Sequence, residues 1–108
     1  MLGGDPIRGH VEAMVLGALR DGPTHGYGLI VRLRDLSRGA FDLKEGTVYP
    51  ALHRLEGDGK LESTWSVEGG RRRRVYALTP AGEKALSRER EAWKAFAGGM
   101  SGVLGGAP

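Results

Sequence analysis

Four consecutive arginines, Arg71 to Arg74, are the residues whose chemistry this sequence indicates most directly. They follow the turn-forming pair Gly69-Gly70 and lie between two segments in which apolar and polar residues alternate, the pattern of a β-hairpin. Guanidinium groups gathered near a hairpin tip suit a polyanion such as the phosphate backbone of DNA. Because successive side chains of a strand point to opposite faces, at most about half of the four should reach phosphate. The phosphate candidates are Arg71, Arg72 and Arg73, while Arg73 or Arg74 could instead pair with carboxylates.

The segment before the hairpin supplies a second set of candidates, on a helix predicted over residues 45–58. Val48, Leu52 and Leu55 share a narrow arc of this helix and should face the core. The opposite face carries Gly46, Pro50, His53, Arg54 and Gly57, with Thr47 at its edge. Small and polar residues on one face suit the major groove, where Arg54 could contact a guanine edge with two hydrogen bonds. The predicted DNA contacts are Thr47, Tyr49, His53 and Arg54. The alternatives are a merely solvated face and, for Tyr49 at the boundary of the buried arc, a packing role.

Two earlier helices should hold this one in place. Apolar residues form a one-sided helical stripe at Ile7, Val11, Met14, Val15, Ala18 and Leu19. A second helix is predicted to be capped by Thr24 and to carry Arg32, Arg34 and Asp35 on its outer side. Its predicted buried face is Tyr27, Ile30, Leu33 and Leu36.

The two strands of the hairpin are predicted to be half-buried. Leu61, Ser63, Trp65 and Val67 share one face of the first strand, and Tyr76 and Leu78 share one face of the second. Three helices followed by such a hairpin make a winged helix-turn-helix. The expected fold class is therefore α+β, mostly α, with this DNA-binding domain over residues 1–80.

A long amphipathic helix is predicted after Thr79-Pro80, a cap followed by proline at the first helical position. Its apolar stripe includes Leu86, Trp93, Phe96 and Met100 and is longer than a small core requires. We therefore predict a dimerisation helix over 81–104, with these four residues at the interface of a homodimer and a flexible tail over 105–108. Because Gly98-Gly99 disfavours helix, continuation past Ala97 stays open.

Glu89 falls near the middle of this stripe, one turn before Trp93, where an unpaired carboxylate is costly to bury. One hypothesis is an ion pair across the dimer, with Arg8 or an arginine of the partner's last helix. The other is a central cavity lined by Glu89 and Trp93 of both subunits, with Met14 or Val15 on its walls. Such a cavity would stack a flat aromatic effector and favour a cationic one.

Composition excludes several other classes of function. The chain has 108 residues, a net charge of +3 and no cysteine, so disulfides and thiolate metal sites are excluded. His10, His25 and His53 lie on different predicted helices without metal-ligand spacing, and no catalytic arrangement can be identified. We expect no enzyme activity, cofactor or metal. No apolar run is long enough to span a bilayer and no signal peptide is evident, so a cytoplasmic protein without membrane contact is expected.

Several short motifs together resemble the PadR family of bacterial transcriptional regulators, in order over residues 7–97. They are Ile7-Arg8-Gly9-His10, Gly22-Pro23-Thr24-His25-Gly26-Tyr27, Glu45-Gly46-Thr47-Val48-Tyr49-Pro50-Ala51-Leu52, Arg54-Leu55-Glu56 and Arg74-Val75-Tyr76-Ala77-Leu78-Thr79. A single C-terminal helix resembles the short subfamily. His25 and Tyr27 match the second-helix motif and would either orient the helix-turn-helix or contact backbone phosphates.

This resemblance implies a homodimeric winged-helix repressor that binds an inverted repeat in promoter DNA. Some short members also bind small aromatic effectors at the dimer centre, which matches the cavity hypothesis for Glu89 and Trp93. The alternative from another class is a winged helix that serves as a protein-interaction module without specific DNA binding. The arginine-rich hairpin disfavours that alternative, because such a charge cluster suits phosphates.

Overall fold

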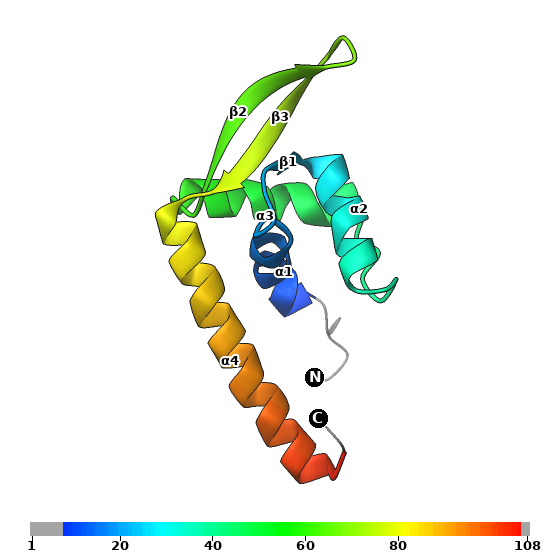
Figure 1. Ribbon diagram of the computed structural model, residues 1–108, viewed down its shortest axis with the longest axis vertical. Coiled ribbons are helices and arrows are strands. Elements are labelled where there is room, and N and C mark those ends of the chain that lie inside the picture. Colours follow the sequence, from blue (N-terminus) through cyan, green and yellow to red (C-terminus); the bar gives the residue numbers. More distant parts are fainter. Residues whose placement is uncertain (1–7, 107–108) are drawn as a thin grey trace.

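Three short helices and a β-hairpin form one body, and a fourth, longer helix leads away from it (Figure 1). The computed structural model describes residues 8–106. Within that range the elements are a 3₁₀ turn Arg8–His10, α1 Val11–Ala18, β1 Thr24–His25, α2 Gly26–Leu36, α3 Glu45–Gly57, β2 Leu61–Glu68, β3 Arg71–Leu78 and α4 Pro80–Leu104. The predicted winged helix-turn-helix architecture is confirmed.

The core lies where α1, α2 and α3 meet beneath the sheet. The predicted inner arc of α3 is correct, since Val48, Leu52 and Leu55 are fully buried, together with Ala51. From α1 the core receives Val15 and Leu16, and from the sheet it receives Leu61 and Tyr76. Ile7, predicted to begin the first apolar stripe, lies outside the described residues. These contacts fix α3 along its length and leave its other side uncovered.

The N-terminus of α2 differs from the prediction, because Thr24 does not cap the helix. Thr24 and His25 instead form β1, which pairs antiparallel with β3 at Tyr76 and Val75. The cap is His25, whose Nδ1 accepts a hydrogen bond of 3.0 Å from the backbone N–H of Gly28. The free edge of β3 offers backbone partners that no local pattern in the sequence reveals.

The buried face of α2 is also rotated relative to the prediction. Leu29 and Leu33 are buried, whereas the side chains of Tyr27 and Leu36 are exposed. Arg32, expected on the outer side, reaches back to the α1–β1 connection and donates to the carbonyl oxygens of Ala18 and Gly22, both at 2.8 Å. Leu29 and Leu33 join the aliphatic core of valine, leucine and alanine side chains.

The hairpin extends well beyond the core, with strand order β1-β3-β2 (Figure 1). Leu61 at its base is buried, but Trp65 is 56 % and Val67 69 % exposed. The predicted half-buried face of β2 is therefore wrong beyond Ser63, because the three helices cover only the base of the hairpin. We call the projecting part of β2 and β3, residues 64–74, the wing.

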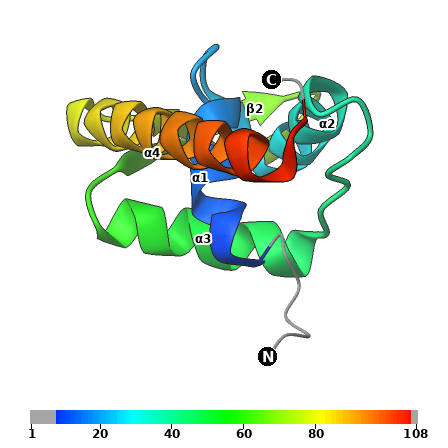
Figure 2. The ribbon, with the colours of Figure 1, turned by 90° about the horizontal axis from the view of Figure 1, so that it is seen from below.

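The last helix begins as predicted. The Thr79 hydroxyl accepts a 3.0 Å hydrogen bond from the backbone N–H of Gly82, and Pro80 stands in the first turn. Only Gly82 and Ala85 of α4 are buried. The helix continues through Gly98-Gly99 to Leu104 and ends at Gly105, which has a positive φ of 78°. Seen from below, α1 lies between α4 and α3 (Figure 2). Residues 107–108 of the predicted tail lie outside the described range.

Candidate nucleic-acid interface

The uncovered side of α3 carries most of the predicted groove residues. Thr47, Pro50, His53 and Arg54 are all exposed, and the space beside Gly46 is open. The residues that alternate with them along α3 are buried and fix the helix to the core, namely Val48, Ala51, Leu52 and Leu55. The core holds α3 firmly, and the exposed residues Gly46, Thr47 and Pro50 in its first turns are small. The backbone of α3 can therefore approach the floor of a DNA groove closely.

Arg54 is held by a residue that the sequence did not single out. Its Nε donates a 2.9 Å hydrogen bond to Oε2 of Glu12 on α1, and both side chains are about half exposed. The ion pair occupies one edge of the guanidinium group. Glu12 directly follows Val11 in the apolar stripe of the first helix, which is unremarkable as a sequence pattern, so only the packing of α1 on α3 identifies its role.

Tyr49 occupies the junction between α2 and α3. Its ring is partly buried against the core, and its hydroxyl lies against the backbone of Gly26, where any Cβ would collide with the phenol. The ring therefore packs, which is one of the two roles considered for Tyr49. Tyr49 also lines a concavity beside the wing, and its contact with DNA stays a prediction.

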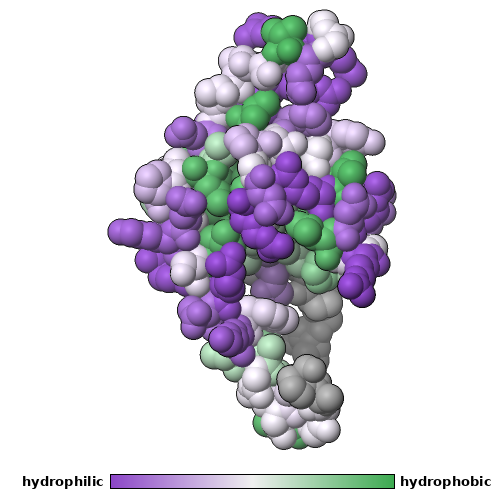
Figure 3. All heavy atoms as spheres, viewed as in Figure 1, coloured by the Kyte–Doolittle hydropathy of each residue, from purple (hydrophilic) through white to green (hydrophobic). Residues whose placement is uncertain are grey.

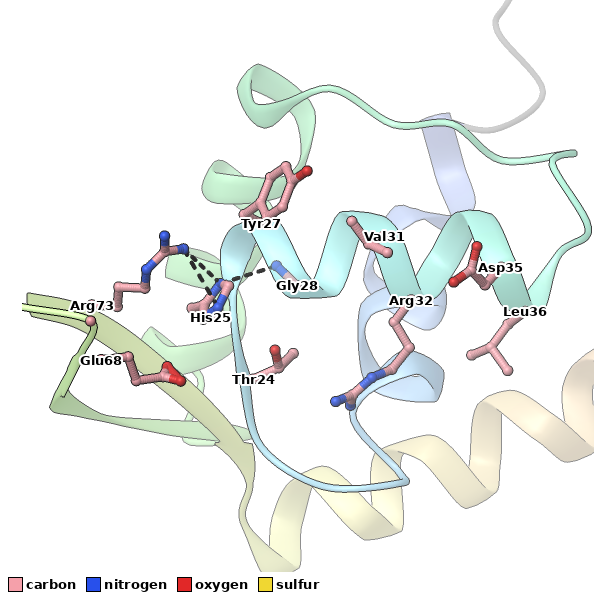
Figure 4. A pocket seen from close by; sticks show the side chains of 11 residues that line it. Thr24, His25, Tyr27, Gly28, Val31, Arg32, Asp35, Leu36, Glu68 and Arg73 are labelled. Atoms are coloured by element: carbon pink, nitrogen blue, oxygen red, sulfur yellow. Dashed lines mark hydrogen bonds between the residues drawn. The ribbon is translucent and has the colours of Figure 1, made fainter. Parts of the chain in front are cut away.

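His25 and Arg73 meet at the N-terminus of α2, as Figure 4 shows. Nη1 of Arg73 lies 3.4 Å from Nδ1 and 3.5 Å from Nε2 of the His25 ring. Since His25 also caps α2, the imidazole orients the helix and places Arg73 beside it. Tyr27, two residues after His25 in the first turn of α2, is 59 % exposed.

The four arginines divide between two faces of the wing. Arg72 and Arg74 lie over the ring of Trp65, with Cζ 4.5 Å and 5.2 Å from the ring centroid. Arg74 also donates to Ser63 Oγ at 2.8 Å and lies 3.9 Å from a carboxylate oxygen of Glu56. It is thus Arg74 rather than Arg73 that pairs with a carboxylate.

A concavity of about 570 Å³ lies where the wing meets the N-termini of α2 and α3. Arginine dominates its lining, which consists of His25, Tyr27, Glu45, Tyr49 and Arg71 to Arg74. Beneath it, burial raises the pKa of the Tyr76 phenol, and the nearby Glu56 carboxylate raises it further. This concavity, next to the uncovered side of α3, has the shape and charge to hold a stretch of phosphate backbone.

A second, larger groove of about 890 Å³ lies on the outer side of α2, toward the wing (Figure 4). Val31, Leu36, Asp35 and Arg32 line it along the helix, and Glu68 and Gly69 line it at the hairpin turn. Its charges are mixed, and it shares His25, Tyr27 and Arg73 with the smaller concavity but has no residue of α3 in its lining.

Three of the four residues predicted for dimerisation lie on α4 beyond its contact with the core. Trp93, Phe96 and Met100 are exposed, whereas Leu86 packs partly against the chain's own core. The Trp93 ring meets His10 edge-on at a centroid distance of 5.8 Å and lies 5.6 Å from the Phe96 ring. Hydrophobic atoms also reach the surface at the far end of α4 (Figure 3).

The residues of the predicted effector site are only partly brought together. Glu89 is exposed and, among the described side chains, forms no ion pair. Met14 is partly buried. Val15 is fully enclosed by the core of its own chain, so it is not available as the wall of a cavity between subunits. The Arg8 side chain, the proposed partner of Glu89, lies outside the described residues.

Comparison with known proteins places this architecture in a family. The model of the transcriptional regulator PadR-like family matches residues 15–88, which is more than half of the chain. The chain belongs to the PadR-like family of transcriptional regulators. Members of this family are regulators of transcription rather than enzymes.

Individual relatives agree with this PadR-like assignment. Transcriptional regulator Rv3488 of Mycobacterium tuberculosis is 42 % identical over 102 residues, covering 91 % of this chain and 92 % of that protein. A PadR family transcription regulator from Clostridium difficile is 30 % identical with a TM-score of 0.79, covering 88 % of this chain and 98 % of its own. Bacillus subtilis PadR, crystallised in complex with operator DNA, is 25 % identical with a TM-score of 0.67, covering 77 % of this chain and 47 % of its own.

The described part of this PadR-like chain also bears on metal binding and membrane insertion. Within residues 8–106 no cluster of three or more histidine, aspartate or glutamate side chains could hold a metal ion. None of the described helices has the length and hydropathy needed to cross a membrane.

Proposed function

We propose that this chain is a transcriptional repressor that binds an inverted-repeat operator in promoter DNA as a homodimer in the cytoplasm. The observation that carries the proposal is the uncovered face of α3 beside an arginine-lined concavity at the base of the wing. An exposed helix face suits the major groove, and the wing suits the adjacent backbone. That Bacillus subtilis PadR was crystallised with operator DNA supports the same class of partner.

Within this proposal the candidate residues have distinct roles. Thr47, His53 and Arg54 contact the groove from α3, with Arg54 as the best candidate for a guanine edge because its bond to Glu12 uses Nε and not the two Nη groups. Phosphate contacts come from the lining of the concavity and the wing, namely His25, Tyr49, Arg71, Arg72 and Arg73.

The homodimer is proposed to form through α4, which would act as a dimerisation helix over 81–104, separate from the DNA-binding domain over 1–80. Trp93, Phe96 and Met100 are large apolar side chains that their own chain leaves exposed. Burying them against a second copy removes apolar surface from water at a gain of about 25 cal/mol per Å². A two-fold axis through α4 would also relate two copies of α3, which accounts for an inverted repeat.

A small, flat, aromatic effector is proposed to bind where the two copies of Trp93 and Glu89 meet. Trp93 offers a ring that is more than half exposed, and Glu89, one helical turn away, offers a carboxylate that forms no ion pair among the described side chains. Met14 remains a candidate for the wall of this site. Effector binding would release DNA if the ligand prefers a dimer geometry in which the two copies of α3 are misaligned.

The decisive experiment is to select bound sites from random and genomic DNA and to titrate the selected duplex with salt. We expect an inverted repeat with half-sites about 10 base pairs apart, or a multiple of that spacing. Affinity should fall steeply with salt, because each neutralised phosphate releases counterions. Recovery of random sequences with no salt dependence would instead favour the alternative, a protein-interaction module without specific DNA binding.

A further inference from the structure

We propose that Trp65 is a positioning residue of the wing, which holds Arg72 and Arg74 in place to receive the DNA backbone. This inference rests on the proposed function and adds two residues to the DNA-contact set above, namely Arg74 as a phosphate ligand and Trp65 as the residue that positions it. Two guanidinium groups lie over the same indole ring, at 4.5 Å and 5.2 Å from its centroid. Tryptophan is the aromatic side chain that attracts cations most strongly.

The strand register explains why these two arginines, and not their neighbours, reach the indole. Trp65 pairs with Arg74 across the hairpin and Val67 pairs with Arg72, so all four side chains belong to one face. Arg71 and Arg73 alternate to the other face, where Arg73 contacts His25. The stack is therefore a product of the hairpin register.

The stacked face is the one directed toward α3. Farther down the same face, Tyr76 and Leu61 are buried in the core, and Arg74 is linked to Glu56 of α3. A phosphate backbone that runs between α3 and the wing would thus meet Arg72 and Arg74 first. Trp65 itself is more than half exposed, so the core does not require an indole at this position.

The physical benefit of the stack is a reduced entropy cost of binding. A free arginine on a projecting hairpin loses much of its rotamer freedom when it contacts a phosphate. Arg74 is already held at three points by Trp65, Ser63 and Glu56, and Arg72 is held by Trp65. Trp65 thereby orders both guanidinium groups before DNA arrives while leaving their outer edges free for phosphate.

The test compares Trp65→Leu and Trp65→Phe with wild type for binding of the selected duplex. Trp65→Leu keeps an apolar side chain but removes the ring, and we expect affinity to fall about three- to tenfold. Trp65→Phe keeps an aromatic ring that attracts cations less strongly, so its affinity for DNA should lie between those of wild type and Trp65→Leu. Val67→Ala is the matched control, because it shortens an apolar side chain on the same face without removing a ring. Circular dichroism and thermal unfolding establish that each variant is folded.

A mutant cycle separates positioning from every other role. In an Arg72→Ala/Arg74→Ala background, Trp65→Leu should cause no further loss of affinity, because there is nothing left to position. A loss equal to that in the wild-type background would show that the indole acts by itself and would overturn the proposal. Unchanged affinity of Trp65→Leu in the wild-type background would overturn it as well. Failure of the wild-type chain to bind any duplex is a separate outcome, which refutes the proposed function itself.

If the Trp65→Leu variant does not fold, the Trp65→Phe variant is carried through the same cycle. The dependence of affinity on salt supplies a second readout. Arg72→Ala should lower the slope of log affinity against log salt by about 0.9 for each lost phosphate contact. Trp65→Leu should weaken binding with little change of slope, since both charges are still present and still neutralise phosphate.

Discussion

Glu12 of α1 and Arg54 of α3 are joined by a hydrogen bond of 2.9 Å between Oε2 and Nε, across 42 residues of sequence. Because both side chains are about half exposed, the pair contributes little to folding, about 0–1 kcal/mol. Its main effect is geometric. The carboxylate fixes one edge of the guanidinium group and so orients the remaining N–H groups on the outer side of α3.

Arg54→Ala should relax base preference at one position of each half-site, at a cost of about 1–3 kcal/mol for the selected operator. Glu12→Gln should weaken the same preference by a smaller amount, because the arginine stays but loses its oriented partner. Competition binding of the operator and single-base variants measures both effects. If Arg54→Ala lost affinity equally for specific and random duplexes, Arg54 would be a phosphate ligand and not a base-reading residue.

Trp93→Ala should weaken homodimerisation by about 2 kcal/mol or more, as buried aromatic residues at interfaces commonly do. Sedimentation over a concentration series measures the dissociation constant. Arg90→Ala, on the polar side of α4, is the matched control and should have no effect. A wild-type chain that sediments as a monomer at micromolar concentration would contradict the proposed dimer.

Titration with planar cationic dyes should quench Trp93 in a Trp65→Phe background, in which Trp93 is the remaining tryptophan. Glu89→Gln should weaken dye binding because the attraction between carboxylate and cation is lost. Glu91→Gln, on the polar side of the same helix, should not. Absence of quenching at about 100 μM dye, which corresponds to only about 5 kcal/mol of affinity, would leave Glu89 with a structural role.

Gly82→Ala should destabilise the fold by about 1–3 kcal/mol, because a Cβ at this position collides with the backbone carbonyl of Lys60. The collision involves backbone, so no side chain can turn aside to relieve it. Gly98→Ala, also within α4 but beside open space, should be neutral or stabilising by up to about 1 kcal/mol. Chemical denaturation of the two variants compares close packing with helix propensity.

Alkaline pH should destabilise the chain through Tyr76. Burial and Glu56 raise the pKa of this phenol in the folded state. The stabilising contribution is fully present below the unfolded pKa of about 10 and is lost as pH rises through the folded pKa. In Tyr76→Phe the free energy of unfolding should therefore decline less across this range than in wild type. Tyr27→Phe, at an exposed ring, serves as the control.

Much of the fold follows from signals that act within a few residues. The inner arc of α3 is a matter of spacing alone, because Val48, Leu52 and Leu55 can reach a core only together. Thr79 caps α4 because its hydroxyl and the N–H of Gly82 are three residues apart, a distance set by helix geometry. Motif similarity likewise identifies the PadR-like family without reference to any tertiary contact.

Tertiary structure decided what depends on partners distant in the chain. Thr24 forms a strand because β3 offers it an edge, and Tyr27 turns outward because the leucines of α2 fit the core better. Trp65 and Val67 are exposed because the hairpin projects beyond the part that the helices cover. The alternation of apolar and polar residues in the sequence does not show where that cover ends. The same holds for the candidate site. The sequence identifies which residues carry charge, but only packing and register place Glu12 on Arg54 and Trp65 beneath two arginines, since both depend on contacts between separate elements.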